Sequence, residues 1–81
     1  MRNLQEVFCK DRHLIKPGSI VLFGGTYFEI VEVPDNKDYI IGLRFLGPSF
    51  GYIHYIIMIN DLHLFDILDE DVAIMVQLKY L

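Results

Sequence analysis

The sequence has a single cysteine and no apolar leader, and both absences point away from secretion. Cys9 is alone among the 81 residues, so no disulfide can form within the chain, and no Asn-x-Ser/Thr acceptor for glycosylation occurs. Residues 1–10 contain no apolar block of the roughly 7–15 residues that a signal peptide needs. We therefore expect a cytoplasmic protein.

Long apolar runs are also missing. The longest near-continuous run, 52–59, is interrupted by His54, whereas a membrane helix requires about 20 residues. Hydrophobic residues nevertheless make up 53% of the chain and charged residues 22%, a composition that excludes a disordered chain. We expect one small domain with no membrane contact, and a core of this size leaves self-association or a bound partner open.

Basic residues are scarce and unevenly placed. The chain has 7 Lys and Arg against 11 Asp and Glu, which gives a net charge of −4. Four of the basic residues lie within residues 1–20, and residues 45–81 hold only Lys79 against five carboxylates. Because binding to phosphates normally requires a cluster of Lys and Arg, nucleic acid is an unlikely partner.

Turn-forming residues recur every 8–13 positions, a spacing typical of a small all-β domain. They fall at Lys16–Ser19, Gly24–Gly25, Pro34–Asp38, Gly47–Gly51 and Asn60–Asp61. Gly24–Gly25 predicts a tight hairpin between strands 20–23 and 26–33, with Val21 opposite Phe28.

Two further strands are expected at 39–46 and 52–59, with a bend at Gly42. In the strand 52–59, one set of side chains should face an interior, and this set is Ile53, Tyr55, Ile57 and Ile59. The opposite set is also largely apolar and needs a cover, and it consists of Tyr52, His54, Ile56 and Met58.

The last segment, 72–80, alternates cleanly and predicts a half-buried fifth strand. A helical turn is expected before it, within 60–68, and Leu4, Val7 and Phe8 indicate a short N-terminal helical segment. The predicted fold is all-β: a five-stranded small barrel over 16–81, preceded by a helical or extended arm over 1–15.

The opening Lys16-Pro-Gly-Ser-Ile-Val21, followed by a hairpin and three more short strands, resembles the SH3-like small barrels, including KOW-type modules. The resemblance implies the same barrel, and its KOW-type form implies nucleic-acid binding as an alternative function. SH3 domains that bind proline-rich peptides share a Trp, which this chain lacks, so peptide binding of that kind is not implied.

Candidate catalytic and metal-binding groups have simpler structural explanations. Gly47-Pro-Ser-Phe-Gly51 matches the nucleophile elbow G-x-S-x-G, but a β-like run follows it where that motif needs a helix, so we interpret it as a turn. A catalytic pair of Cys9 and His13 would need a third group that orients the histidine, and the sequence identifies none. The possible metal ligands are His13, His54, His63, Asp61 and Asp66. Their spacing along the chain fits no zinc motif. We expect that the protein is not an enzyme and that it binds neither a cofactor nor a metal ion.

The segment 61–71 carries five carboxylates and no Lys or Arg. Its run Asp69-Glu70-Asp71 predicts either a solvated turn or an electrostatic docking patch, and the ligand order of a calcium-binding EF-hand is absent.

The leading hypothesis is a non-enzymatic protein-binding module that docks through an apolar, tyrosine-rich sheet face. The expected partner-binding residues are Tyr27, Tyr39, Tyr52, Tyr55, Asp69, Glu70 and Asp71. The expected partner is another protein with a basic surface, and a specific form of the hypothesis is a small phage-type inhibitor or regulator of a nucleic-acid-handling host enzyme.

Two alternatives remain open. Nucleic-acid binding is suggested by the KOW-like opening and by Lys10, Arg12, His13 and Lys16 near Phe8. A structural homo-oligomer would instead cover the apolar face with further copies of the chain.

Overall fold

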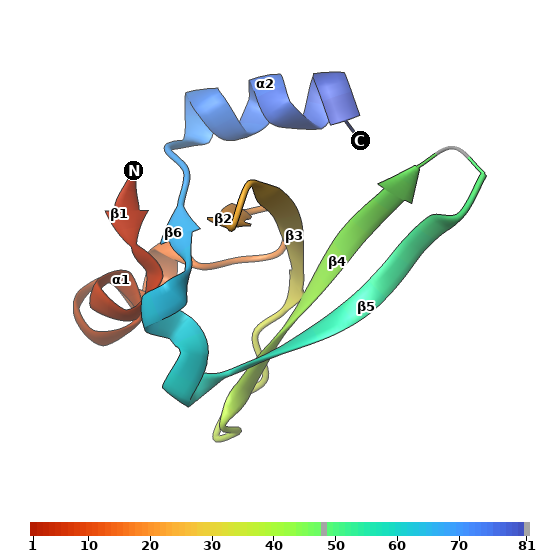
Figure 1. Cartoon of the computed structure of the whole chain (residues 1–81). Helices are drawn as coiled ribbons and strands as arrows, with labels where there is room; N and C mark the ends of the chain where they lie inside the picture. The colour runs from red at the N-terminus through yellow and green to blue at the C-terminus, as the bar shows by residue number, and fades with distance from the viewer. Residues whose placement is uncertain (48, 81) are drawn as a thin grey trace.

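An antiparallel sheet of six strands organises the chain, in the order β1-β6-β2-β3-β4-β5 (Figure 1). The computed structural model describes residues 1–47 and 49–80, with the side chains of 1–44 and 49–79. The strands are β1 (Arg2–Asn3), β2 (Ile20–Phe23), β3 (Thr26–Glu32), β4 (Tyr39–Gly47), β5 (Gly51–Met58) and β6 (Asp66–Ile67). The helices are α1 (Leu4–Lys10) and α2 (Glu70–Tyr80), with 3-10 turns η1 (Arg12–Leu14) and η2 (Ile59–Leu64).

The predicted hairpin is confirmed in position and register. Val21 pairs with Phe28 across β2 and β3, and Phe23 pairs with Thr26. Gly24 and Gly25 connect the strands with φ angles of 56° and 78°. Because side chains other than glycine rarely adopt these angles, the two glycines permit the tight turn.

The next two strands are also confirmed, as β4 and β5. Gly42 lies in β4 where the pairing with β3 shifts register, between Ile30 and Glu32. A Cβ atom at this position would lie 3.5 Å from the Cβ of Phe28, an ordinary van der Waals contact, so the packing across the sheet does not by itself require glycine. The predicted side-chain orientations of Phe45 and Leu46, and the placement of Pro48, lie outside the described residues.

The prediction of a fifth strand over 72–80 is wrong, because this segment forms α2. Asp69 precedes the helix and its carbonyl oxygen accepts a hydrogen bond from the N–H of Ala73 at 2.8 Å. Glu70 and Asp71 occupy the first turn and Lys79 the last, an arrangement that the helix dipole favours. Helical spacing brings Ala73 and Val76 onto one side, where both are buried.

The helical turn predicted within 60–68 is confirmed as η2. The chain then returns through β6, only two residues long, which lies between β1 and β2. In the described part of the chain the sheet is open, with β1 and β5 at its edges, so closure into a barrel is not confirmed. The molecule is a mostly β small domain with short helices.

The sheet is covered on both faces, but only over part of its area. On one face α1, η2 and the strands enclose the main cluster: Leu4, Val7, Ile15, Val21, Phe28, Ile30, Ile40, Ile57, Leu62, Phe65 and Ile67. On the other face, Ala73 and Val76 of α2 bury Ile20 together with Leu68. The N-terminal helical segment is thus confirmed as α1. The division into 1–15 and 16–81 stays a prediction, although Leu4, Val7 and Ile15 belong to the shared core, and residue 81 lies outside the described residues.

Candidate docking surface

The β4–β5 hairpin extends away from the rest of the fold (Figure 1). Its register runs without interruption from the pair Tyr39–Met58 to the pair Phe45–Tyr52. Directly paired residues of antiparallel strands point to the same face, and successive residues alternate between faces. One face of the hairpin therefore carries Tyr39, Ile41, Leu43, Tyr52, His54, Ile56 and Met58, a set that we call the hairpin face.

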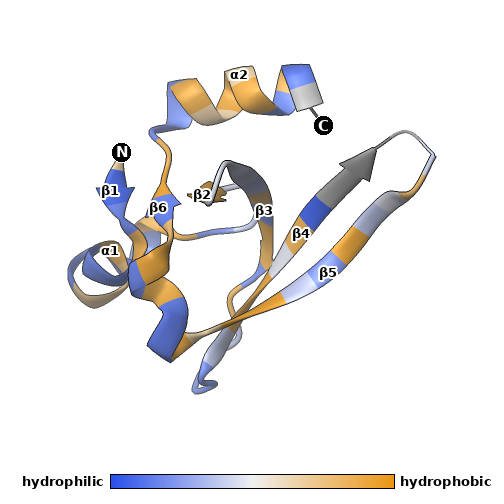
Figure 2. Cartoon of the chain, viewed as in Figure 1, coloured by the Kyte–Doolittle hydropathy of each residue, from blue (hydrophilic) through white to orange (hydrophobic). Residues whose placement is uncertain are grey.

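The hairpin face is apolar and open to solvent. Tyr52 is 48% exposed, Ile56 58% and Met58 41%, whereas Ile57, between the last two, is 1% exposed. The predicted need for an external cover over Tyr52, Ile56 and Met58 therefore fits this part of the fold. Figure 2 shows apolar residues along this hairpin and around α2.

The opposite side of β5 differs from the prediction. Ile53 and Tyr55 were expected to face an interior, yet they are 50% and 43% exposed. Tyr55 contacts Phe28, with ring centroids 5.1 Å apart, and Ile57 alone in β5 is buried. The main cluster ends near Ile57 because the hairpin extends beyond the elements that cover the sheet.

The four predicted tyrosine anchors do not converge. Tyr39 and Tyr52 share the hairpin face, separated by six residues of strand, or about 20 Å. Tyr55 points to the other face. Glu29 pairs with Leu43, so Tyr27, two residues before Glu29 in β3, lies on the same side of the sheet as Tyr39 and Tyr52, where it is half-buried against the cluster that α2 covers. The structure thus places three of the four on one side of the sheet.

The predicted acidic residues form the start of α2. Asp69, Glu70 and Asp71 are all exposed, and the Oδ2 of Asp69 lies 4.0 Å from the N-terminal amino group. Figure 1 shows this end of α2 on the opposite side of the molecule from the hairpin tip. The acidic run therefore contributes to the start of a helix and lies apart from the hairpin face.

The three histidines considered as metal ligands lie on different elements. His13 is in η1, His54 in β5 and His63 in η2, and all three are exposed. Among the described residues no three His, Cys, Asp or Glu side chains group together in a way that would hold a metal ion. Cys9 is exposed on α1, and Ser49 is exposed in the turn that connects the paired Gly47 and Gly51.

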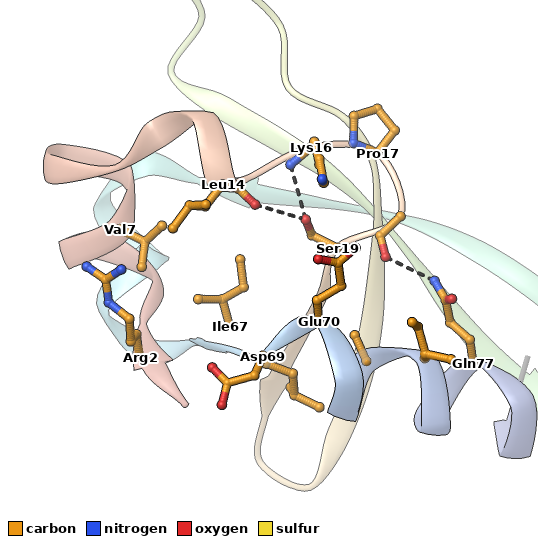
Figure 3. A pocket seen from close by; sticks show the side chains of 14 residues that line it. Arg2, Val7, Leu14, Lys16, Pro17, Ser19, Ile67, Asp69, Glu70 and Gln77 are labelled. Atoms are coloured by element: carbon orange, nitrogen blue, oxygen red, sulfur yellow. Dashed lines mark hydrogen bonds between the residues drawn. The ribbon is translucent and has the colours of Figure 1, made fainter.

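A cavity of about 440 Å³ lies between the N-terminal segment, the turn at Lys16–Ser19 and the start of α2 (Figure 3). The Ser19 hydroxyl accepts from the N–H of Lys16 and donates to the carbonyl of Leu14, each at 3.2 Å. Gln77 Nε2 donates to the carbonyl of Gly18 at 3.0 Å and thereby fastens α2 to this turn. These polar groups serve the fold, since their hydrogen bonds join elements of the chain to one another.

Arg2 also lines the cavity. Its guanidinium lies 2.9 Å from Asp11 Oδ2 and 3.2 Å from Glu6 Oε1. The hydrogen bond to Asp11, followed by that to Glu6, raises the pKa of Arg2 above its ordinary value, so the side chain stays protonated. The ion pairs hold Arg2 against α1. Sequence reasoning missed this cavity because it interpreted 72–80 as a strand.

Comparison with known proteins adds no relative: no family model, curated protein or solved structure matches the chain. Among the described residues, no helix has the length and apolar character required to cross a membrane.

Proposed function

We propose that the chain is a non-enzymatic protein-binding module that docks on another protein through the hairpin face. The observation that carries the proposal is the exposure of Tyr52, Ile56 and Met58 on one side of a regular hairpin. Contiguous exposed apolar surface is unusual on a soluble monomer and marks interaction sites. Tyr39 and Tyr52 lie near the two ends of this face and are its aromatic anchors.

The proposed partner presents an apolar surface with a basic margin. The net charge of the chain is −4, and Asp69, Glu70 and Asp71 form an exposed acidic group at the start of α2. Because this group lies apart from the hairpin face, it acts on the rate of encounter, in a salt-dependent way. The specific form of the proposal is a small phage-type inhibitor or regulator that covers the basic surface of a nucleic-acid-handling host enzyme.

The SH3-like fold belongs to the same proposal. The meander β2–β3–β4–β5 is followed by η2, and β6 then returns to pair with β2. This order, with a Pro-Gly turn before β2, supports a relationship to small five-stranded barrels in spite of the open sheet. The binding surface would be one face of the last two strands of that meander, β4 and β5.

The test uses two neighbouring positions on opposite faces of β5. Ile56 belongs to the hairpin face and is 58% exposed, and Ile53 faces the other way and is 50% exposed. Wild type, Ile56→Asp and Ile53→Asp are immobilised, incubated with host lysate, and the captured proteins are compared by mass spectrometry.

We expect one defined protein on the wild type and on Ile53→Asp, and its loss on Ile56→Asp, because an unpaired carboxylate in an apolar interface is costly. Equal capture by all three would contradict the proposal. With the purified partner, removal of the charges at 69–71 should slow association at low salt and have little effect on dissociation.

A further inference from the structure

Among the described residues, no strand pairs with one side of the β5 backbone. Ile59 donates its N–H to the carbonyl of Asp38 at 2.8 Å, toward β4. Successive residues of a strand direct their N–H and C=O groups to opposite sides, and the register from Met58 back to Tyr52 is continuous. Ile57, Tyr55 and Ile53 therefore bond to β4, and the backbone groups of His54, Ile56 and Met58 point away from it.

The exposed edge of β5 lacks the features that normally prevent strand pairing. Its eight residues include no Asp, Glu, Lys, Arg or Pro, and no bulge interrupts it between Tyr52 and Met58. Edge strands that are long, regular and apolar are templates for the addition of another strand. Figure 1 shows β5 along the outer side of the hairpin, and it is the last strand of the sheet in the described residues.

The strand that fits this edge best is β5 of a second copy. It brings the same uncharged sequence, so no charge is placed against the apolar side chains of the first copy. Antiparallel pairing of two identical strands follows a two-fold axis, the commonest symmetry of soluble homo-oligomers. The register that uses the most outward backbone groups pairs His54 with Ile56 of the second copy and places Tyr55 opposite itself.

The charges beside β5 are complementary in this arrangement. Arg44 is the direct neighbour of Ile53, toward the hairpin tip, and is exposed. Asp38 and Asp61 lie at the other end of β5, one bonded through its backbone to Ile59 and the other within η2. Antiparallel pairing turns the Arg44 end of each hairpin toward the Asp38 and Asp61 end of the other, with the two β5 strands between Arg44 and Asp38 of the second copy.

We propose that two copies of the chain associate through antiparallel pairing of their β5 edges, centred on Tyr55, into one continuous sheet. The inference does not rest on the docking function, because it uses the backbone edge of β5. The side chains of the hairpin face still point outward from the combined sheet. The dimer therefore presents two hairpin faces on one side.

The first test separates the backbone of β5 from its side chains at a single position. His54→Pro removes an outward N–H together with the imidazole, and His54→Ala removes only the imidazole. The N–H of His54 does not contribute to the β4 ladder, so both variants should remain folded, which thermal unfolding of each variant verifies.

Sedimentation velocity over a concentration series then measures the dimer dissociation constant. We expect a dimer for wild type and His54→Ala. For His54→Pro we expect the dimer dissociation constant to rise by at least about 30-fold, because two symmetry-related hydrogen bonds are lost. A wild-type chain that stays monomeric at millimolar concentration would overturn the inference, and so would folded variants that weaken equally.

The second test examines the register in a Cys9→Ser background. Residues directly opposite at a non-hydrogen-bonded site have Cα atoms about 4.5 Å apart, within the range of a disulfide. Tyr55→Cys should therefore form a disulfide-linked dimer on mild oxidation. His54→Cys should not, because the two copies of that residue lie about two positions out of register. Cross-linking at 54 in place of 55, or at neither, would overturn the proposed pairing.

Both tests are independent of the docking proposal. Loss of the lysate partner in Ile56→Asp with an intact dimer would support docking through the side chains alone. An intact lysate interaction in a monomeric His54→Pro would show that the edge and the hairpin face act separately.

Discussion

The two edges of the sheet differ in length and in cover. β1 has two residues, and both of their side chains are held: Arg2 by Glu6 and Asp11, and Asn3 by the carbonyl of His63 at 2.9 Å. β5 has eight residues, and its apolar side chains are exposed on both faces, apart from Ile57. The chain thus protects one edge with its own polar groups and leaves the other exposed, and the proposed pairing of two copies rests on this difference.

The same contrast holds for the two halves of the sheet. Around β2 and β3 the sheet is covered on one face by the main cluster and on the other by α2. Around the outer part of β4 and β5, Tyr52, Ile53 and Ile56 are about half exposed. Substitutions in β5, α2 and β1 test how sharply these regions differ.

The largest expected effect comes from two adjacent isoleucines of β5. Ile57 is buried in the main cluster and Ile56 belongs to the hairpin face. Ile57→Ala should lower the free energy of unfolding by about 2–5 kcal/mol, since it leaves a cavity in the core. Ile56→Ala should change it by less than about 0.5 kcal/mol. Urea denaturation of dilute protein measures both, and similar losses would contradict the assignment of the two faces.

The second prediction concerns the attachment of α2. Val76 is buried against the sheet, whereas its neighbour Met75 is exposed. Val76→Asp should destabilise the protein by about 3 kcal/mol, because it places a carboxylate against Ile20 without a partner. Met75→Asp should change stability by less than about 0.5 kcal/mol. Thermal unfolding with far-ultraviolet circular dichroism compares the two, and equal effects would mean that α2 does not cover this face.

The smallest effect is expected at the protected edge. The Oδ1 of Asn3 accepts hydrogen bonds from the N–H groups of Gln5 and Glu6 and thereby caps α1. Asn3→Ala should cost about 1 kcal/mol. Asn3→Asp keeps the acceptor and loses the donor to His63, so its loss should be smaller. If Asn3→Asp were as damaging as Asn3→Ala, which loses the cap and the donor together, the contact with His63 and not the helix cap would account for the contribution of Asn3.

The central strands could be predicted because their signals are local. Gly24–Gly25 fixes the register of the first hairpin, and the turn at 47–51 separates two apolar runs. The helical segment over α1 and the turn η2 also followed from residue spacing and capping residues. Each of these elements is determined largely by the residues within it.

The last element could not be predicted from alternation alone. The residues Val72, Ile74 and Val76 favour a strand by propensity and by a period of two. However, the residues between them are also largely apolar, so the alternation is a weak signal. Packing of Ala73 and Val76 against Ile20 stabilises the helix, and this contact is absent from the sequence pattern. Two helix signals were left unused by the strand interpretation. One is the acidic run before Val72, and the other is Lys79 near the end of the segment.

The candidate site was predicted in part for the same reason. The open side of β5 follows from alternation within one strand, so Tyr52, Ile56 and Met58 were placed correctly. The orientation of Tyr55 away from this surface follows from the same alternation, whereas the partial burial of Tyr27 depends on the packing of α2. That packing is not encoded in a single segment.

Hydrogen exchange of the β5 amides, measured by NMR at low and at high protein concentration, tests the open edge most directly. In dilute protein the amides of His54, Ile56 and Met58 should exchange rapidly and those of Tyr55 and Ile57 slowly. At high concentration the first group should become protected as the second copy pairs with it. Exchange rates of His54 and Ile56 that do not change with concentration, or that already match that of Tyr55 in dilute protein, would contradict the account.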